Sequence, residues 1–470
     1  MNRYSKYLLV TLLTSIFSLP SFAAPDQQEK EEALAYSLGT HAYTFGFPWV
    51  YLSQLRYMWT QVDTGVASVP YAPVNTFFRT AHLADAKYRN GGSPNNDTLY
   101  AISWIDVRDE PIILSHPDIN NRYFTFELGS MDSDNFAYVG LRETGSKAGN
   151  FAIVGPDWQG TLPADVQAIS PSRTNTILML GRILVDGQED IATAKALMDQ
   201  YRLTPLSQWG NGKEPVVEPR KVLVPFDRKT DPLADWKTMN AAMTLDPPHA
   251  AHQYLVSQFA ALNIGPGQDV EQASEATKRG LARAAKDGFQ MLKKVMSNGA
   301  GKQVNGWTYP PAVMGRAGLD NQFLVRAATQ CLGGIISHDQ EEAIYINTFT
   351  DNDGKVLRGD DAYTFRFSAD NLPPINDLGF WSMTLYGTDY NFVDNEMDRY
   401  SIGNRTKNLV YGEDGSLTLY LQSKKPNGKN AANWLPSPAG RDFYLVLRTY
   451  LPKTTLIEQT WTPPALQRAQ

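Results

Sequence analysis

Two long stretches of this sequence consist of short runs of β-branched and aromatic residues, broken at regular intervals by turn residues. The first covers residues 95–190, and the second begins near Trp307. Several short strands with turns between them are typical of a sandwich or a barrel, so each stretch predicts a β domain. The predicted strands are 100–107, 111–114, 123–128, 136–139, 150–154 and 174–185, then 343–350, 362–367, 380–386, 417–422 and 442–450.

Helical patterns lie before and between these β stretches. Residues 29–60 have apolar side chains at helical spacing, and Pro48 predicts an interruption there. Its aromatic stripe, from Phe45 to Trp59, faces either a core or the wall of a ligand pocket. Further helices are predicted at 191–201, 233–244, 250–262 and 271–296. The predicted division is an N-terminal helical segment (24–60), a first β domain (61–202), a connection and helical segment (203–306) and a second β domain (307–470).

Residues 1–23 have the pattern of a secretory signal peptide. Arg3 and Lys6 precede an uncharged apolar run over 8–19, and Ser21-Phe22-Ala23 predicts cleavage after Ala23. The alternative is a membrane anchor, but the run is shorter than the roughly 20 residues that a bilayer requires. No later stretch is apolar enough to span a membrane. We therefore expect a periplasmic or secreted protein without a membrane span.

Charge and cysteine content limit the partners and the chemistry. The chain has 43 basic and 49 acidic residues, a net charge of -6, whereas a nucleic-acid partner requires a basic surface. Cys331 is the only cysteine, so the chain has no internal disulfide and must be stabilised by its core. Cys331 is either a nucleophile or a small buried hydrophobe, and its apolar flanks at 327–336 favour the second interpretation.

Short motifs assign no reaction. The sequence lacks Gly-x-Ser-x-Gly, Gly-x-Gly-x-x-Gly, a Walker loop, His-Glu-x-x-His and Cys-x-x-Cys. Asp351-Asn352-Asp353-Gly354 is similar to part of a calcium loop but fails the EF-hand spacing, so a hairpin turn is the better prediction. His249 and His252 lie three residues apart and form either half of a metal site or a solvated helix start.

Two polar clusters border predicted strands. Asn96 and Asp97 precede one strand, and Asp132 and Asp134 follow another. Together they offer oxygen ligands for a divalent metal such as Ca²⁺ or Mg²⁺, or a carboxylate pair for acid–base chemistry. The alternative is that these residues form Asx-turns and cap the ends of strands.

A third polar run belongs to the second β domain. Aromatic and polar side chains alternate there, as on a surface that binds a sugar or an aromatic ligand. A loop held over a sheet end by a buried Asp–Arg pair has the same composition. The residues concerned are Trp381, Tyr386, Asp389, Tyr390, Asn391, Asp398 and Arg399.

Several of these motifs resemble two paired domains of unknown function, families 1254 and 1214. The resemblance to the first is carried by Ser93-Pro94-Asn95-Asn96-Asp97-Thr98-Leu99-Tyr100, by 123–124 and by 155–158. The resemblance to the second is carried by 372–374, 380–386, 400–406 and 433–436. It implies a mainly β fold with α, in which a helical segment separates two β-sandwich-like domains. Asn404 stands where relatives often have Asp, which weakens a carboxylate role there.

From these features we expect a protein that binds or acts on a small organic molecule in a pocket between the domains. The predicted ligand-binding residues are Asn96, Tyr100, Trp104, Trp381 and Tyr386. Asp97 or Asp389 is the predicted general base, and Arg399 is predicted to pair with an acidic group or with the ligand. The alternative is a non-catalytic interaction protein of the cell envelope. The substrate, a bound metal and the oligomeric state are not specified by the sequence.

Overall fold

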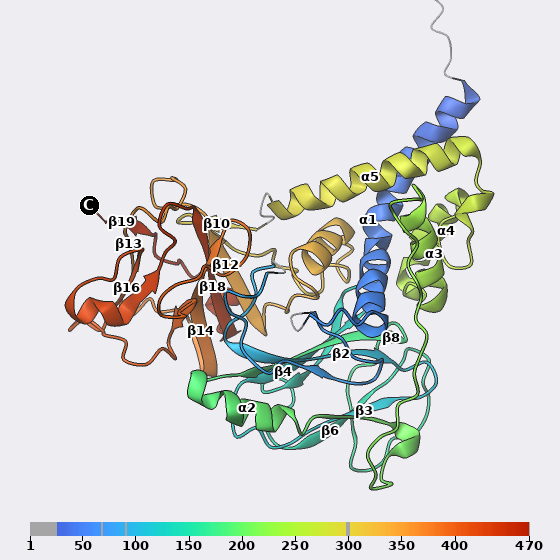
Figure 1. Cartoon of the computed structure of the whole chain (residues 1–470). Coiled ribbons are helices and arrows are strands. Elements are labelled where there is room, and N and C mark those ends of the chain that lie inside the picture. Colours follow the sequence, from blue (N-terminus) through green and yellow to red (C-terminus); the bar gives the residue numbers. More distant parts are fainter. Residues whose placement is uncertain (1–25, 67–68, 90–91, 298–300, 470) are drawn as a thin grey trace, which may run out of the picture.

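The computed structural model describes residues 26–66, 69–89, 92–297 and 301–469. These residues form two β sandwiches and a layer of helices (Figure 1). The expected fold class, mainly β with α in two sandwich-like domains, is confirmed. The signal peptide predicted at residues 1–23 lies outside the described residues. None of the described helices has the length and apolar character that a bilayer crossing requires.

The first sandwich consists of a five-stranded sheet, in the order β1-β2-β8-β4-β5, and a four-stranded sheet, in the order β7-β6-β3-β9. Alternate residues of β2, among them Leu99 and Ala101, face the second sheet, and Tyr100 and Trp104 face the other way. The strands are β1 (Phe78–Arg79), β2 (Thr98–Asp106), β3 (Ile112–His116), β4 (Phe124–Ser130), β5 (Asn135–Gly140), β6 (Gly149–Ile153), β7 (Gln167–Ala168), β8 (Thr176–Leu184) and β9 (Arg202–Pro205). Helix α2 (Ile191–Met198) packs on this core through Ala194 and Met198.

The second sandwich consists of a six-stranded sheet, β10-β11-β12-β18-β14-β15, and a four-stranded sheet, β17-β16-β13-β19. Leu447 of β18 and Met383 of β14 face the core between these sheets, and Arg448 and Ser382 face outward. The strands are β10 (Gln303–Val304), β11 (Trp307–Thr308), β12 (Ala343–Thr348), β13 (Tyr363–Phe367), β14 (Ile375–Gly387), β15 (Ser401–Gly403), β16 (Leu417–Gln422), β17 (Trp434–Pro436), β18 (Phe443–Pro452) and β19 (Gln467–Arg468). The short helix α7 (Thr454–Ile457) follows β18.

The turn predicted at Asp351-Asn352-Asp353-Gly354 is confirmed, but the hairpin is shorter than expected. The Asp351 carboxylate accepts the backbone N–H groups of Asp353 and Lys355, and Thr350 bridges to Val356. The strands on either side, β12 and β13, belong to different sheets. The prediction that they form one hairpin is therefore wrong, because the chain crosses to the other sheet after the turn.

The helices cover the face of the five-stranded sheet that points away from the β3–β6 sheet (Figure 1). A Cβ atom at Gly280 of α5 would lie 2.5 Å from the Glu32 carbonyl oxygen of α1, so glycine permits this close crossing. The helices are α1 (Gln27–Gln61), α3 (Ala234–Leu245), α4 (Gln253–Phe259), α5 (Glu275–Ser297), α6 (Phe323–Arg326) and the π-helical η6 (Ala327–Leu332). The aromatic stripe from Phe45 to Trp59 packs in this core. Cys331 is buried here, as predicted.

The interruption predicted at Pro48 is wrong. Helix α1 continues from Gln27 through Pro48 to Gln61. A proline removes one intrahelical hydrogen bond and usually kinks a helix. Here the residues on both sides of Pro48, including Phe47 and Trp49, are fully buried. Packing around the whole circumference of the helix therefore outweighs the lost bond.

Candidate functional site

The polar loop before β2 lies between the two sandwiches and joins them. The Asn95 side-chain amide donates to the Tyr450 hydroxyl at 2.5 Å, and the Ser401 hydroxyl donates to Asn96 Oδ1 at 3.1 Å. The Tyr386 hydroxyl donates to backbone carbonyls of the same loop. Tyr386, Ser401 and Tyr450 belong to the second sandwich, so the loop makes polar contacts across the domain interface.

Asp97 forms an ion pair across the same interface. Arg405 Nη2 lies 2.7 Å from Asp97 Oδ1, and the Ser382 hydroxyl donates to Asp97 Oδ2 at 2.6 Å. The Arg405 guanidinium also lies over the ring of Phe380, 4.6 Å from its centroid. Both oxygens of the buried Asp97 carboxylate therefore have strong partners. This arrangement links the two domains. To act as a general base, Asp97 would first have to break its ion pair with Arg405.

Five side chains face one another beside this loop, and we call them the tyrosine–arginine cluster. Tyr100 and Arg182 are paired on β2 and β8, and the Arg182 guanidinium lies 5.3 Å from the Tyr100 ring. Tyr345 of β12 lies 6.1 Å from the Tyr450 ring and 5.8 Å from the Arg448 guanidinium. Tyr100 and Arg182 are near enough to Tyr345 and Tyr450 to influence the pKa of both, so each domain contributes part of one group.

Behind this cluster, Arg182 is neutralised by a buried acid. Its Nη1 donates to Glu127 at 2.6 Å and lies 2.7 Å from His338 Nε2. His338 Nδ1 lies 3.2 Å from the same Glu127 oxygen. Burial opposes ionisation of Glu127, but His338 and Arg182 outweigh it and lower its pKa. Burial and the Arg182 charge lower the pKa of His338, so the ring is neutral and accepts from Arg182.

Arg448 has no such acid beside it. Its Nη1 donates to the Thr384 hydroxyl at 2.9 Å, and its Nη2 donates to the Ser93 carbonyl at 2.8 Å. The residue is 6 % exposed. Within the described part of the chain, no carboxylate oxygen lies within ion-pair distance of its guanidinium. The domain interface therefore contains a buried positive charge that is satisfied only by neutral oxygens.

Models of two known families match the two domains that form this interface. Residues 74–205 match the family described as "Protein of unknown function (DUF1254)", and residues 342–454 match "Protein of unknown function (DUF1214)". The chain is a DUF1254–DUF1214 protein. The DUF1254 match covers the first sandwich from before β1 to β9, and the DUF1214 match covers the second from β12 to β18.

One solved structure has the same fold over nearly the whole DUF1254–DUF1214 chain. The crystal structure of the VPA0106 protein from Vibrio parahaemolyticus is 24 % identical, with a TM-score of 0.72, and covers 93 % of this chain and 100 % of that one. An uncharacterised protein from Burkholderia cenocepacia is 12 % identical over 94 % and 96 % of the two chains, with a TM-score of 0.44. A search of curated proteins finds no match.

Two predicted tryptophans lie outside the domain interface of this DUF1254–DUF1214 protein. Trp104 is buried in the helical core, where its ring centroid lies 6.5 Å from that of Trp59. Trp381 is one residue from Ser382 on β14 and therefore points to the opposite face, into the core of the second sandwich. Of the predicted ligand-binding residues, the structure brings together Asn96, Tyr100 and Tyr386 only.

Asp389 and Arg399 of the DUF1214 domain do not join this site either. Asp389 is exposed on a turn, where its carboxylate accepts the backbone N–H of Asn391. Arg399 donates to the carbonyl oxygens of Ala432 and Trp434, at 3.2 and 2.9 Å. Burial lowers the pKa of Arg399. The Asp–Arg pair considered for this loop is therefore absent from the described residues.

The two predicted carboxylate clusters lie at opposite ends of one sheet. Strands β2 and β4 both pair antiparallel with β8 and so run in the same direction. Asp97 precedes β2, whereas Asp132 and Asp134 follow β4, which separates them by roughly 25 Å at 3.3 Å per residue. The combined site expected from them is therefore wrong. Among the described residues, no three His, Cys, Asp or Glu side chains are placed to hold a metal ion.

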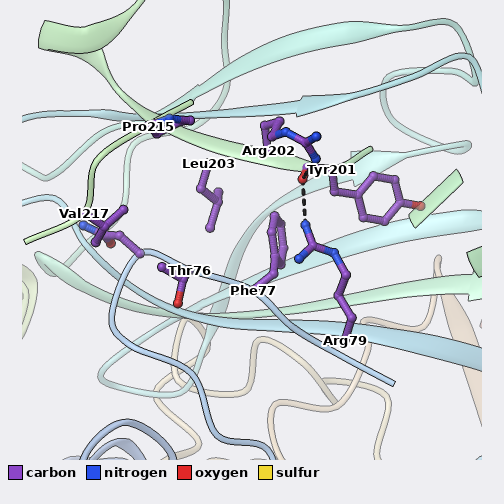
Figure 2. Close-up of a pocket in the computed structure, with 9 residues that line it drawn as sticks. Thr76, Phe77, Arg79, Tyr201, Arg202, Leu203, Pro215 and Val217 are labelled. Carbon is purple, nitrogen blue, oxygen red and sulfur yellow. Dashed lines mark hydrogen bonds between the residues drawn. The ribbon is translucent and has the colours of Figure 1, made fainter. Parts of the chain in front are cut away.

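Two surface hollows lie away from the domain interface. The smaller, near β9, is lined by Thr76, Phe77, Leu203 and Val217, and Figure 2 shows the Tyr201 ring pointing away from these side chains. Arg79 beside it donates to the Tyr201 carbonyl, so its charge is already engaged (Figure 2). The second hollow lies at the edge of the DUF1214 domain and is lined by Asp394, Glu396, Ser423, Lys424, Lys425, Trp434 and Ser437, among others.

The charged residues of the tyrosine–arginine cluster and its support were missed by the sequence reasoning. Glu127, Arg182 and Arg448 each interrupt a strand whose other residues are almost all buried. A charge in the middle of an apolar strand is a detectable signal, because such a group must have a buried partner or a ligand. Which strands lie opposite one another, however, depends on the arrangement of the two domains.

Proposed function

We propose that this protein binds a small organic anion between its two domains, at the tyrosine–arginine cluster. The observation that carries the proposal is the buried Arg448 guanidinium without a carboxylate partner. A buried charge is costly unless it is paired, and neutral oxygens compensate for it only in part. A carboxylate or a similar anionic group would supply the missing charge.

The surroundings of Arg448 suit the organic part of such a ligand. Tyr100 and Tyr345 are half-buried although both lie within strands between the domains, so they are less deeply buried than Arg448. Aromatic rings with polar tips bind small organic molecules through both surfaces. In this proposal Arg448 pairs with the anionic group, and Tyr100 and Tyr345 contact the rest of the molecule. The ion pair between Asp97 and Arg405 holds the two domains in position.

The test is native mass spectrometry of the full mature protein purified from its own cells. We expect a small molecule to remain bound to the wild type and to be lost from Arg448→Met. Arg441→Met, on an exposed residue of the same domain, is the matched control and should retain it. Circular dichroism and thermal unfolding establish that each variant is folded.

Retention of the same molecule by a folded Arg448→Met variant would contradict the proposed site. A wild type that carries no small molecule but co-purifies with another protein would favour the alternative, a non-catalytic interaction protein of the cell envelope. The proposal concerns binding and assigns no reaction, because Asp97 and Glu127 are both engaged by arginines.

A further inference from the structure

A second group of buried charges lies at the opposite end of the five-stranded sheet from the tyrosine–arginine cluster. It consists of Asp132, Asp134, Arg173, Arg326 and His252, and we call it the acid–arginine cluster. Arg173 precedes β8, whereas Arg182 lies near the end of that strand. The two arginines are therefore roughly 25 to 30 Å apart at 3.3 Å per residue, and the clusters are separate.

The carboxylates of this cluster are fully engaged. Arg173 Nη2 lies 3.1 Å from Asp132 Oδ2, and Arg173 Nη1 lies 3.5 Å from Asp134 Oδ2. Arg326 Nη1 lies 3.6 Å from the same Asp134 oxygen. The other oxygen of each carboxylate accepts a hydrogen bond, from the Ser130 hydroxyl at 2.6 Å and from the Gly318 backbone at 2.9 Å. Each of the four oxygens therefore already has a partner, and none of them is hydrogen-bonded to the nitrogens that remain.

Those remaining nitrogens have no partner. Among the described residues, Arg173 Nε, Arg326 Nε and His252 Nδ1 form no hydrogen bond. Arg326 is 0 % exposed and His252 is 6 % exposed, so bulk water does not satisfy them. Buried polar atoms are paired in the great majority of cases, and guanidinium nitrogens can only donate. Arg173 Nε and Arg326 Nε are therefore donors that lack an acceptor.

Aromatic rings border the buried side of the cluster. The Arg326 guanidinium lies over the rings of Phe45 and Phe323, at 5.4 and 5.0 Å. The His252 ring meets the same two rings edge-on, at 5.6 and 5.1 Å. Arg173 and Phe323 are half-buried, so the cluster is less deeply covered on their side.

We propose that the acid–arginine cluster is a second binding site, which takes the carboxylate of a small organic acid between Arg173, Arg326 and His252. The carboxylate oxygens would accept from the unpartnered guanidinium N–H groups, as charge-assisted hydrogen bonds. The aromatic rings of Phe45 and Phe323 would exclude water from the pair. This site is independent of the anion proposed at Arg448.

In this proposal, binding of the carboxylate is coupled to protonation of a group in the cluster. The charged and titratable groups that face the cluster are those named above together with His249 and Cys331. Burial lowers the pKa of His252 to about 4 and raises that of Cys331 to about 12, so both are neutral near pH 7. Burial and the neighbouring Asp132 raise the pKa of Asp134 to about 7. Asp134 is thus the group whose protonation increases the positive charge of the site.

The test uses sodium formate as the probe, with sodium chloride at the same ionic strength as the reference. We expect formate to raise the midpoint of thermal unfolding of the full mature protein in a saturable manner. Binding should be about tenfold tighter at pH 6 than at pH 8, since a group with a pKa of about 7 is protonated in roughly nine molecules of ten at the lower pH and one of ten at the higher.

Two variants and a matched control locate the site, and a fourth variant separates it from the first proposal. Arg173→Met should weaken formate binding about tenfold, whereas Arg366→Met, on an exposed arginine of the other domain, should not change it. Asp134→Asn, which imitates the protonated acid, should make binding independent of pH. Arg448→Met removes the anion site between the domains and should leave the pH dependence of the formate effect unchanged.

Three results would overturn the proposal. The first is an absence of any formate-specific stabilisation of the wild type. The second is a folded Arg173→Met variant that binds formate as tightly as the wild type. The third, which remains decisive if Arg173→Met does not fold, is an Asp134→Asn variant with the pH dependence of the wild type.

Discussion

Buried charged residues decide the chemistry of this protein at the scale of single side chains. Glu127, Arg182 and Arg448 lie on strands that are otherwise apolar. Glu127 and Arg182 neutralise each other at 2.6 Å, whereas Arg448 has only neutral acceptors. Arg182 is thus paired with a carboxylate, whereas Arg448 is not, and only Arg448 remains to pair with an anionic ligand.

The ion pair between Asp97 and Arg405 should stabilise the folded protein measurably. Removing one partner leaves the other buried without a countercharge, so Asp97→Ala and Arg405→Met should each lower the free energy of unfolding by about 3 kcal/mol. The double variant should be less unstable than the sum of the two by about 2 kcal/mol. Urea unfolding measures all four proteins. Asp377→Ala, on an exposed residue, is the control, and strict additivity would contradict the pairing.

Asp134 should make the stability of the protein depend on pH. Its pKa is about 7 in the folded protein and ordinary in the unfolded chain, so the folded state holds more protons between these values. Stability therefore decreases as the pH rises from about 4 to about 7 and stays reduced above that. Asp134→Asn removes this contribution and should be more stable, relative to the wild type, at pH 8 than at pH 5. Urea unfolding at both pH values tests this, and an equal difference at both would contradict it.

At the scale of elements, β8 determines how the two proposed sites are separated. It pairs with β2 on one side and β4 on the other, and its direction places Arg182 near one end and Arg173 before the other. One strand therefore contributes to the domain interface, and the segment before it contributes to the helical side. A shift of its register by one residue would turn Arg182 into the core of the first sandwich.

The crossing of α1 and α5 should be intolerant of side-chain volume at Gly280. A Cβ atom there would lie 2.5 Å from the Glu32 carbonyl oxygen and 2.8 Å from Ala35 Cβ. Although alanine favours a helix by about 1 kcal/mol over glycine, Gly280→Ala should destabilise the protein by about 1 to 3 kcal/mol, because the helices must separate.

Lys286→Ala, at an exposed position of α5, is the matched control for the Gly280 variant. It should change the free energy of unfolding by no more than about 0.5 kcal/mol. Thermal and urea unfolding of the two variants are compared with the wild type. A Gly280→Ala variant that is as stable as the wild type would show that the helices adapt at little cost.

At the scale of the whole molecule, the two sandwiches are joined by polar contacts of the loop before β2 and by an apolar cluster in which Tyr123 meets Phe380 and Tyr450. The Asn95–Tyr450 and Asp97–Arg405 contacts both cross the interface. We expect the wild type to unfold in one calorimetric transition and the Asn95→Ala/Asp97→Ala double variant to unfold in two. Each sandwich has its own core, so each can lose its partner before it unfolds. A single transition in the double variant would contradict this.

Local patterns in the sequence were sufficient for most elements. Predicted helices at 233–244 and 271–296 correspond to α3 and α5, and predicted strands at 417–422 and 442–450 correspond to β16 and β18. These patterns succeed because alternation and helical spacing are properties of neighbouring residues. Pro48 is one exception, since its helix is maintained by packing from distant segments.

Residue patterns alone indicated two β-rich regions, the helices before and between them and the turn at Asp351, and the resemblance to families 1254 and 1214 implied that both regions are sandwich-like. The tertiary structure decided which polar residues meet. It separated Asp97 from Asp132, turned Trp104 and Trp381 into cores, and brought Tyr345 and Tyr450 near Tyr100 and Arg182. The physical reason is that strand spacing fixes which side of a sheet a residue occupies, whereas its neighbours across an interface depend on how the sheets pair and pack over long sequence separations.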